Sequence, residues 1–213
     1  MKTLKITPNQ GSYNLFQELW FEGVINQYLA ENQVCNVALS GGTTPRDVYY
    51  KIGNRSVVDW SRVNIFAVDE RWVPFDDERS NSKLISECFP NANVFTVDTT
   101  LESPSVSASR YAEVIEEHVT NMSFDVLSLG IGTDGHTASL FPDTPALDST
   151  DWVTDGHGGG LDRVTFTFPL INRAKDILMI AGPDKNKIVN KLVKDRENIP
   201  AQRVERCKII HHL

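Results

Sequence analysis

Residues 124–142 read FDVLSLGIGTDGHTASLFP, an apolar run that passes into a glycine-rich segment with a carboxylate and a histidine. The apolar half has the length and composition of a buried strand, and the glycines after it indicate a turn. Asp134 and His136 stand in this turn. The stretch therefore predicts a buried strand that presents polar side chains at its carboxyl end.

The same order, a short apolar run and then a polar cluster, recurs on both sides of this stretch. The runs NVAL, VNIFAV and DILMI precede the clusters SGGTTP (40–45), DERW (69–72) and AGPDK (181–185). RVTFTF (163–168) is expected as a further strand. Helical segments are expected at residues 12–31, 45–53, 106–119 and 184–195. Short apolar strands that alternate with helices indicate an α/β fold with a mostly parallel sheet.

The polar clusters are expected along one rim of this sheet. In open α/β sheets, ligands bind at the carboxyl ends of the strands, and each cluster follows a strand. No repeat, linker or low-complexity segment marks a boundary, so residues 1–213 are expected to form a single domain. DGHGGG (155–160) is expected as a mobile loop, because glycine has little conformational preference.

The composition restricts the partners. The chain has 21 basic and 28 acidic residues, a net charge of −7, which disfavours nucleic-acid and anionic-membrane partners. A small anionic substrate remains compatible, because a few local cations can dominate one pocket. The three cysteines include no C-x-x-C pair and suggest reduced thiols. With no apolar segment of signal-peptide or membrane-spanning length, a cytoplasmic protein is expected. Its oligomeric state is left open, and a monomer is compatible with the sequence.

The segment Gly130–Gly135 matches G-x-G-x-x-G as a bare pattern. A dinucleotide-binding fingerprint needs a long helix directly after the glycines, and Pro142 and Pro145 interrupt such a helix within about two turns. A tight turn without a ligand explains the glycines and leaves Asp134 and His136 without a role. Because a histidine titrates near neutral pH, a presented His136 suits general-base catalysis. The structural alternatives are a histidine bound to a backbone carbonyl and an Asp134 that caps a short helix.

The SGGTTP cluster suits an anion. Backbone N–H groups and hydroxyls at a turn before a helix bind phosphate well, which makes Ser40, Gly41, Gly42 and Thr44 candidate phosphate ligands. A strand-to-helix turn with an N-cap is the alternative. The spacing and the terminal Lys-Ser/Thr of a Walker A loop are absent.

Cations follow or open other strands. Arg71 could clamp a phosphate with two nitrogens while a carboxylate of the same cluster, Asp69 or Glu70, fixes its direction. A surface ion pair is the alternative. Arg163 opens RVTFTF, and Lys185 closes AGPDK.

Taken together, five blocks resemble the glucosamine-6-phosphate isomerase/6-phosphogluconolactonase family in order and spacing. They are ALSGGTTPRDVY, FAVDERWVPFDDERSNSKLI, LGIGTDGHTASLFPDTPAL, RVTFTFPLIN and IAGPDKNKIV. Deaminases of the family typically read DGHIAFNEP and a DEY-like run, where this chain has DGHTASLFP and DERWV. Both differences favour the lactonase branch. The chain end CKIIHHL lacks the tryptophan that often closes the family's last strand.

The resemblance implies a Rossmann-like, doubly wound sheet flanked by helices, as in glucosamine-6-phosphate deaminase and ribose-5-phosphate isomerase. It implies hydrolysis of 6-phospho-D-glucono-1,5-lactone without a metal or an organic cofactor. His136 would be the catalytic base, with Asp134 beside it. The remaining site residues would bind the phosphorylated substrate: Ser40, Gly41, Gly42, Thr44, Asp69, Arg71, Arg163 and Lys185.

Two other functions stay open from the sequence. One is isomerisation of an amino sugar phosphate with release of ammonia, as in the related deaminases. The other is a phosphosugar-binding module that senses a metabolite without turnover.

Overall fold

A seven-stranded sheet forms the centre of the protein, with the strand order β1-β10-β9-β6-β2-β3-β5. The computed structural model describes residues 1–194 and 198–212. The strands are β1 (Lys2–Thr7), β2 (Cys35–Leu39), β3 (Val63–Ala67), β5 (Asn93–Phe95), β6 (Val126–Gly130), β9 (Asp176–Ala181) and β10 (Cys207–His212). Every neighbouring pair in this sheet is parallel, which confirms the α/β fold with a mostly parallel sheet.

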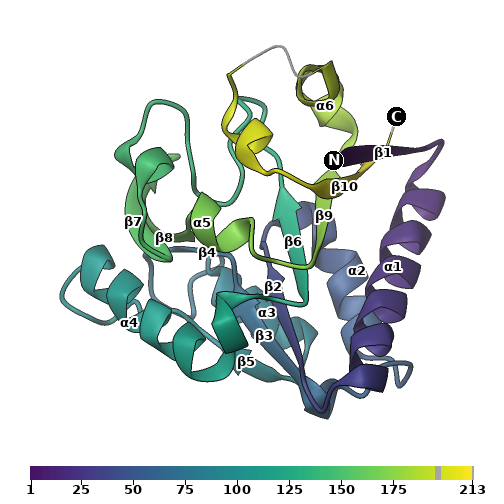
Figure 1. Ribbon diagram of the computed structural model, residues 1–213, viewed down its shortest axis with the longest axis horizontal. Coiled ribbons are helices and arrows are strands. Elements are labelled where there is room, and N and C mark those ends of the chain that lie inside the picture. The colour runs from purple at the N-terminus through teal and green to yellow at the C-terminus, as the bar shows by residue number, and fades with distance from the viewer. Residues whose placement is uncertain (195–197, 213) are drawn as a thin grey trace.

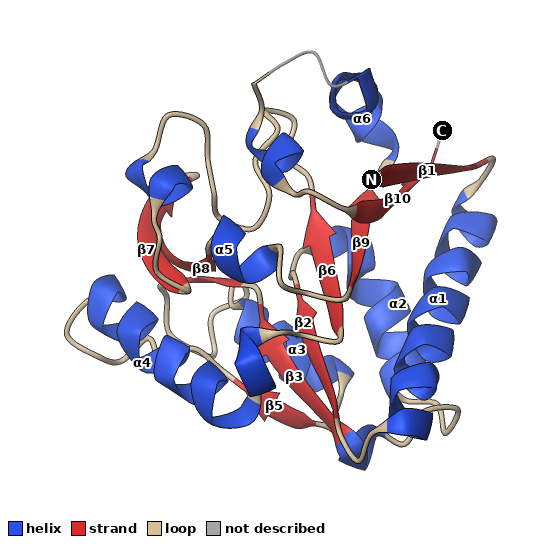
Figure 2. Cartoon of the chain, viewed as in Figure 1, coloured by secondary structure: helices blue, strands red, loops and turns tan. Residues whose placement is uncertain are grey.

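Helices cover both faces of the sheet (Figures 1 and 2). One face carries α1 (Gln10–Glu31), α2 (Thr43–Gly53) and α3 (Asn81–Cys88). Residues of α4 (Pro104–His118), α5 (Phe168–Ile171) and α6 (Asn186–Lys194) belong to a second hydrophobic core, on the opposite face. Short 3₁₀ helices lie at η1 (Trp60–Arg62), η2 (Thr120–Met122), η3 (Pro145–Asp148), η4 (Pro183–Lys185) and η5 (Pro200–Arg203). No helix of the described chain is long and apolar enough to span a membrane.

The central strands separate two hydrophobic cores, which is why their sequences are mostly apolar. In β2, Val37 and Leu39 belong to the core under α1–α3, whereas Ala38 belongs to the core on the opposite face. In β3, Ile65 belongs to the core under α1–α3 and Phe66 to the core on the opposite face. A strand buried on both faces reads as a continuous hydrophobic run, and this pattern is typical of parallel sheets.

A second, three-stranded antiparallel sheet consists of β4 (Asp69–Arg71), β8 (Leu161–Phe166) and β7 (Val153–Gly158). The sequence predicts one strand in VNIFAVDE, but the run divides at Val68, where the chain leaves the parallel sheet. Val68 lies between the two sheets: its N–H donates to Leu39 and its carbonyl accepts from Phe166.

The prediction of a mobile loop at residues 155–160 is wrong. Residues 155–158 complete β7 and pair with β8, up to Gly158 opposite Leu161. Gly159 and Gly160 form the turn between the strands, with φ values of +62° and +78°. Two consecutive positive φ values are what a tight hairpin turn requires, so these glycines make a turn in ordered structure.

The helix boundaries differ slightly from those expected. α2 begins at Thr43, two residues before Pro45, and α1 begins at Gln10, where Asn9 accepts a hydrogen bond from the Ser12 N–H. The helix expected over 184–195 divides into η4 and α6, and residue 195 lies outside the described residues. The three cysteines are buried free thiols.

Candidate active site

The carboxyl ends of β2, β6 and β9 enclose a pocket of about 80 Å³. Its walls come from three predicted clusters: the turn after β2, the glycine segment after β6, and η4 after β9. They include Ser40, Gly41, Gly42, Thr44, residues 128–131, Gly182 and Lys185. The structure thus places Lys185 at the same pocket as the SGGTTP turn.

The glycines of this turn are required by its geometry. Gly42 has φ +102° and stands at the N-cap of α2, a backbone conformation that favours glycine. A Cβ atom on Gly41 would lie 2.0 Å from the Oδ1 atom of Asn81, so a side chain there would displace Asn81. The Oγ atom of Ser40 is buried and has no hydrogen-bond partner in the described structure. The turn therefore presents backbone and an unpartnered hydroxyl at the positive end of α2.

A larger pocket of about 630 Å³ lies on the other side of Gly42, and Arg71 lines it. The Nη1 atom of Arg71 donates to the backbone carbonyl of Arg79 at 2.6 Å. Its Nε atom is buried and unpartnered within the described chain. Arg46, from the first turns of α2, lines the same pocket and adds a second cation. This part of the site therefore has a surplus of donors, as an anion-binding site needs.

Glu70 does not direct the guanidinium of Arg71, contrary to the expectation that a carboxylate of the cluster would do so. Its carboxylate is 1% exposed and accepts backbone N–H groups from Asn81 at 2.8 Å and Ser82 at 2.6 Å. It also accepts from the Ser80 hydroxyl and from the Arg71 backbone N–H. Glu70 thus binds the orphan N–H groups at the start of α3 and fixes β4 to that helix.

Asp69 contacts the loop that carries His136. Its Oδ2 atom accepts a 2.6 Å hydrogen bond from the Ser139 hydroxyl, and the side chain is buried. The backbone N–H of Ser139 donates to the Thr165 hydroxyl on β8. Asp69 therefore links β4 to the histidine loop, and it is not among the residues that line the two pockets described above.

His136 and Asp134 form a hydrogen-bonded pair. The Nδ1 atom of His136 lies 2.6 Å from the Oδ1 atom of Asp134, which also accepts the His136 backbone N–H at 3.1 Å. Partial burial raises the pKa of Asp134, but hydrogen bonds from the backbone and ring of His136 outweigh it and hold this pKa below its usual value. An ionised carboxylate only accepts hydrogen bonds, so the proton of a neutral imidazole lies on Nδ1 and the Nε2 lone pair is free.

The glycines around the pair fit this geometry. A Cβ atom on Gly132 would lie 2.1 Å from the Nδ1 atom of His136, so only glycine leaves room for the ring. Gly135 has φ +87°, and its carbonyl accepts the Ala201 N–H. No helix directly follows this glycine segment, since Thr137 and Leu140 form an isolated bridge and the next helical turn is η3. The G-x-G-x-x-G match is therefore a turn that positions a histidine.

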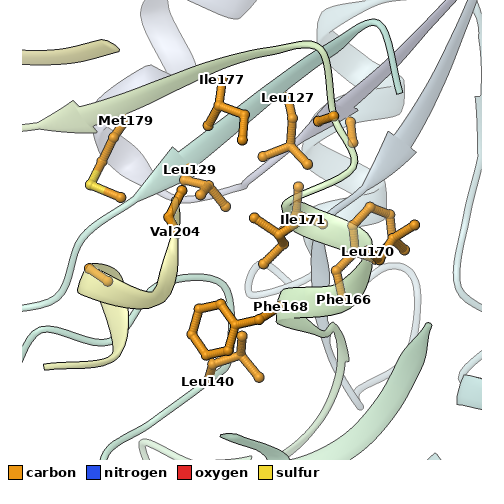
Figure 3. Close-up of a cluster of buried hydrophobic side chains, with 14 of the residues drawn as sticks. Leu127, Leu129, Leu140, Phe166, Phe168, Leu170, Ile171, Ile177, Met179 and Val204 are labelled. Atoms are coloured by element: carbon orange, nitrogen blue, oxygen red, sulfur yellow. The ribbon is translucent and has the colours of Figure 1, made fainter. Parts of the chain in front are cut away.

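Leu140 anchors the histidine loop in the hydrophobic core. It is fully buried, and Figure 3 shows it beside Phe168 at the edge of the cluster that β6, β9 and α5 share. Leu127 and Leu129 of β6 belong to the same cluster. The loop is thus held at its start by β6 and four residues after His136 by this core.

Arg163 is not among the residues that line the two pockets, and its side chain contacts the hairpin. Its Nε and Nη2 atoms donate to the Gly158 carbonyl at 3.1 and 2.9 Å. Its guanidinium carbon lies 5.8 Å from the ring centre of Phe141. Burial lowers the pKa of Arg163, and the negative charge of Asp69 opposes this effect. Direct binding of the substrate by Arg163 stays a prediction.

Several residues of the site region were not singled out from the sequence. Arg46 and Arg79 lie within the quoted blocks, but nothing in an isolated arginine reveals that it lines a pocket. Ser80 is a helix-start signal, because serine is favoured at the N-cap, and in the structure its hydroxyl accepts the Lys83 backbone N–H at the start of α3. Ser139 and Phe141 lie in the DGHTASLFP block, beside the histidine that drew attention to it.

A family model described as glucosamine-6-phosphate isomerases/6-phosphogluconolactonase matches residues 17–211. The chain belongs to this family. Curated 6-phosphogluconolactonases of the family include one from Synechocystis, 34% identical over 85% of this chain and 82% of that protein. Another, from Chlamydia pneumoniae, is 33% identical over 85% of this chain and 75% of that protein. The crystal structure of the Thermotoga maritima 6-phosphogluconolactonase superposes with a TM-score of 0.91 at 28% identity, with all of both chains covered.

Proposed function

We propose that this family member hydrolyses 6-phospho-D-glucono-1,5-lactone to 6-phosphogluconate, a reaction of the oxidative pentose phosphate pathway. The observation that carries the proposal is the pair of His136 and Asp134, with Nδ1 bound to the carboxylate at 2.6 Å. In the described chain, no group forms a hydrogen bond with the Nε2 atom. Relatives of the same family named 6-phosphogluconolactonase support the choice of substrate.

In the proposed reaction, Nε2 of His136 takes a proton from a water molecule as that water attacks the lactone carbonyl. The attack forms a tetrahedral oxyanion, which hydrogen-bond donors must stabilise. The ring C–O bond then breaks, and the imidazolium returns its proton to the departing ring oxygen. Asp134 stabilises the imidazolium between these two steps. No acyl-enzyme is needed, because water is the nucleophile.

The phosphate fixes the lactone in the site. We place it and the sugar hydroxyls around Gly42, between the two pockets, which the start of α2, Lys185 and Arg71 line. Lys185 pairs with the Asp184 carboxylate at 2.7 Å in the structure, so an anion there would share its ammonium with Asp184. The unpartnered atoms Ser40 Oγ and Arg71 Nε support this placement, because buried polar groups normally have partners. Binding energy from the phosphate then orients the reacting carbon against the base. Residues 1–213 act as one domain in this proposal.

Replacing Asp134 by asparagine is expected to lower kcat by about 10- to 100-fold, because the neutral amide cannot stabilise the imidazolium that forms on His136. The amide oxygen can still accept a hydrogen bond from the Nδ1–H group. Steady-state kinetics on the lactone measure the effect. The matched control is Asp162→Asn, since Asp162 accepts a similar 2.9 Å bond from the exposed His157. Equal losses in both variants would contradict the role of Asp134.

Turnover is expected to persist without divalent metal. The sequence contains no metal-ligand spacing such as H-E-x-x-H. In the described parts of the chain, no group of three or more His, Cys, Asp and Glu residues could hold a metal ion. The measurement is the lactonase rate after dialysis against EDTA. Complete loss that zinc restores would contradict the proposed mechanism.

The proposal is tested against the other activity of the family by giving the purified protein both substrates. Formation of 6-phosphogluconate from the lactone, without ammonia release from glucosamine 6-phosphate, is expected. Ammonia release would assign the protein to the deaminases. Tight binding of phosphosugars without turnover of either would identify a sensor.

A further inference from the structure

Three groups of the protein lie against the ring of His136: the Gly132 backbone, the Asp134 carboxylate and the Phe141 ring. The Gly132 backbone approaches so closely that a Cβ atom there would lie 2.1 Å from Nδ1. Asp134 binds Nδ1, and the ring of Phe141 lies with its centre 4.3 Å from the centre of the imidazole, at an interplanar angle of 36°. Gly132 and Asp134 precede His136 and both meet it at the Nδ1 edge, whereas Phe141 follows it by five residues and packs against the ring itself. Phe141 therefore adds a contact that does not depend on the Nδ1 atom.

Gly158 of β7 lies against the ring of Phe141. A Cβ atom on Gly158 would lie 2.1 Å from Cε2 and 2.2 Å from Cδ2 of that ring. The position needs no left-handed backbone, because the positive φ values of the hairpin are at Gly159 and Gly160. Close packing against Phe141, and not backbone conformation, therefore explains a glycine here.

Arg163 holds this part of the hairpin in place. Both its Nε and its Nη2 atoms donate to the Gly158 carbonyl, and its guanidinium lies near the same Phe141 ring. The side chain is buried, and Arg163 is the register partner of both Gly156 on β7 and Arg71 on β4. A series of contacts thus runs from Arg163 through the Gly158 carbonyl and the Phe141 ring to His136.

We propose that Phe141 is a positioning residue for His136, and that Gly158 and Arg163 act through it. The proposal rests on the lactonase function proposed above, in which His136 is the base. It assigns Arg163 a different role from a substrate cation, because the contacts of Arg163 reach the histidine through protein groups. A fixed imidazole is already held in the geometry from which it takes the proton of the attacking water. Displacement of a catalytic group by about 1 Å can lower the rate about 10²-fold.

Gly158→Ala tests the positioning role of Phe141 most directly, because the substitution removes no side chain and no hydrogen bond. The added methyl group must push the Phe141 ring away from its present place. We expect kcat to fall by about tenfold or more, with KM for the phosphorylated lactone changed by less than about twofold. The matched control is Gly156→Ala, two residues earlier on the same strand, where a Cβ atom would meet only ordinary contacts at 3.5 Å and beyond. Its kcat should equal that of the parent.

A double variant tests the order of the contacts. In a Phe141→Ala background the added methyl group has no ring to displace, so Gly158→Ala should then have no further effect on kcat. A full additional loss in that background would show that Gly158 acts elsewhere. Arg163→Lys should lower kcat on the phosphorylated and the unphosphorylated lactone alike. A rise in KM confined to the phosphorylated lactone would return Arg163 to phosphate binding and overturn this part of the proposal.

A spectroscopic measurement tests the position of the His136 ring independently of the proposed lactonase function, because it needs no turnover. The imidazole C–H resonances of His136 are assigned in an NMR spectrum by their loss in His136→Asn. The ring current of the neighbouring Phe141 displaces them, so Phe141→Leu and Gly158→Ala should change their chemical shifts, whereas Gly156→Ala should not. Thermal melts confirm that each variant is folded. Unmoved resonances together with parental kcat in folded Phe141→Leu and Gly158→Ala would overturn the proposal.

Discussion

His136→Asn is expected to lower kcat by about 10²–10⁴-fold, the loss typical for removal of a positioned general base. Asparagine cannot take a proton from water near neutral pH, so the attacking water is no longer activated. The fold should survive, because the His136 side chain is 30% exposed and its ring is not part of either hydrophobic core. Steady-state rates and a thermal melt on the same preparation measure both effects.

The chain supplies a matched control for this variant. His157 also binds a carboxylate through Nδ1, at 2.9 Å from Asp162, but it lies on the exposed hairpin. His157→Asn should leave kcat unchanged. Parental activity in His136→Asn, or an equal loss in both variants, would remove His136 from the mechanism.

Arg71→Ala and Lys185→Ala are each expected to raise KM for the phosphorylated lactone by about tenfold or more. A lost charge-assisted contact costs about 1.5–3 kcal/mol, and about 1.4 kcal/mol corresponds to one factor of ten. The unphosphorylated lactone offers the same carbonyl without the anion, so its kcat/KM should change much less. The comparison of the two lactones therefore isolates the contribution of the phosphate.

Arg110 provides the control for these cations. It pairs with Glu113 on the exposed face of α4, outside the residues that line the two pockets. Arg110→Ala should have the parental KM for both lactones. If Arg71→Ala and Lys185→Ala reduced kcat/KM equally on both substrates, these residues would act on the carbonyl or on folding, and the phosphate assignment would be wrong.

The parallel sheet could be predicted from the sequence because its central strands are buried on both faces. β2, β6 and β9 each appear as a mostly apolar run followed by a polar turn. β1 cannot be predicted in the same way, since Lys2 and Lys5 interrupt its apolar residues and most of the strand is exposed at the sheet edge. The antiparallel sheet could not be predicted for another reason: only Val68 separates β4 from β3, and pairing with distant residues of β8 decides where the chain passes from one sheet to the other.

The site was predictable to the extent that its residues are neighbours in the sequence. The Asp134–His136 contact joins residues two positions apart, and the turn after β2 is contiguous. The contact of Asp69 with Ser139 spans 70 residues, and that of Arg163 with Gly158 uses a backbone carbonyl. Neither leaves a signal in a single sequence. The glycines of residues 155–160 predict flexibility by their composition alone. Their order in the structure comes from pairing in the hairpin and from the packing of Gly158 against Phe141, and neither can be read from the sequence.

The most direct test of the account is the rate at which freshly prepared 6-phosphogluconolactone opens in the presence of the purified protein. Spontaneous hydrolysis, measured in buffer alone, is subtracted, and proton release and formation of 6-phosphogluconate are followed together. The account predicts a rate that rises in proportion to protein concentration, saturates with the lactone, and returns to the buffer value with His136→Asn. A rate equal to that of buffer at every protein concentration would contradict it.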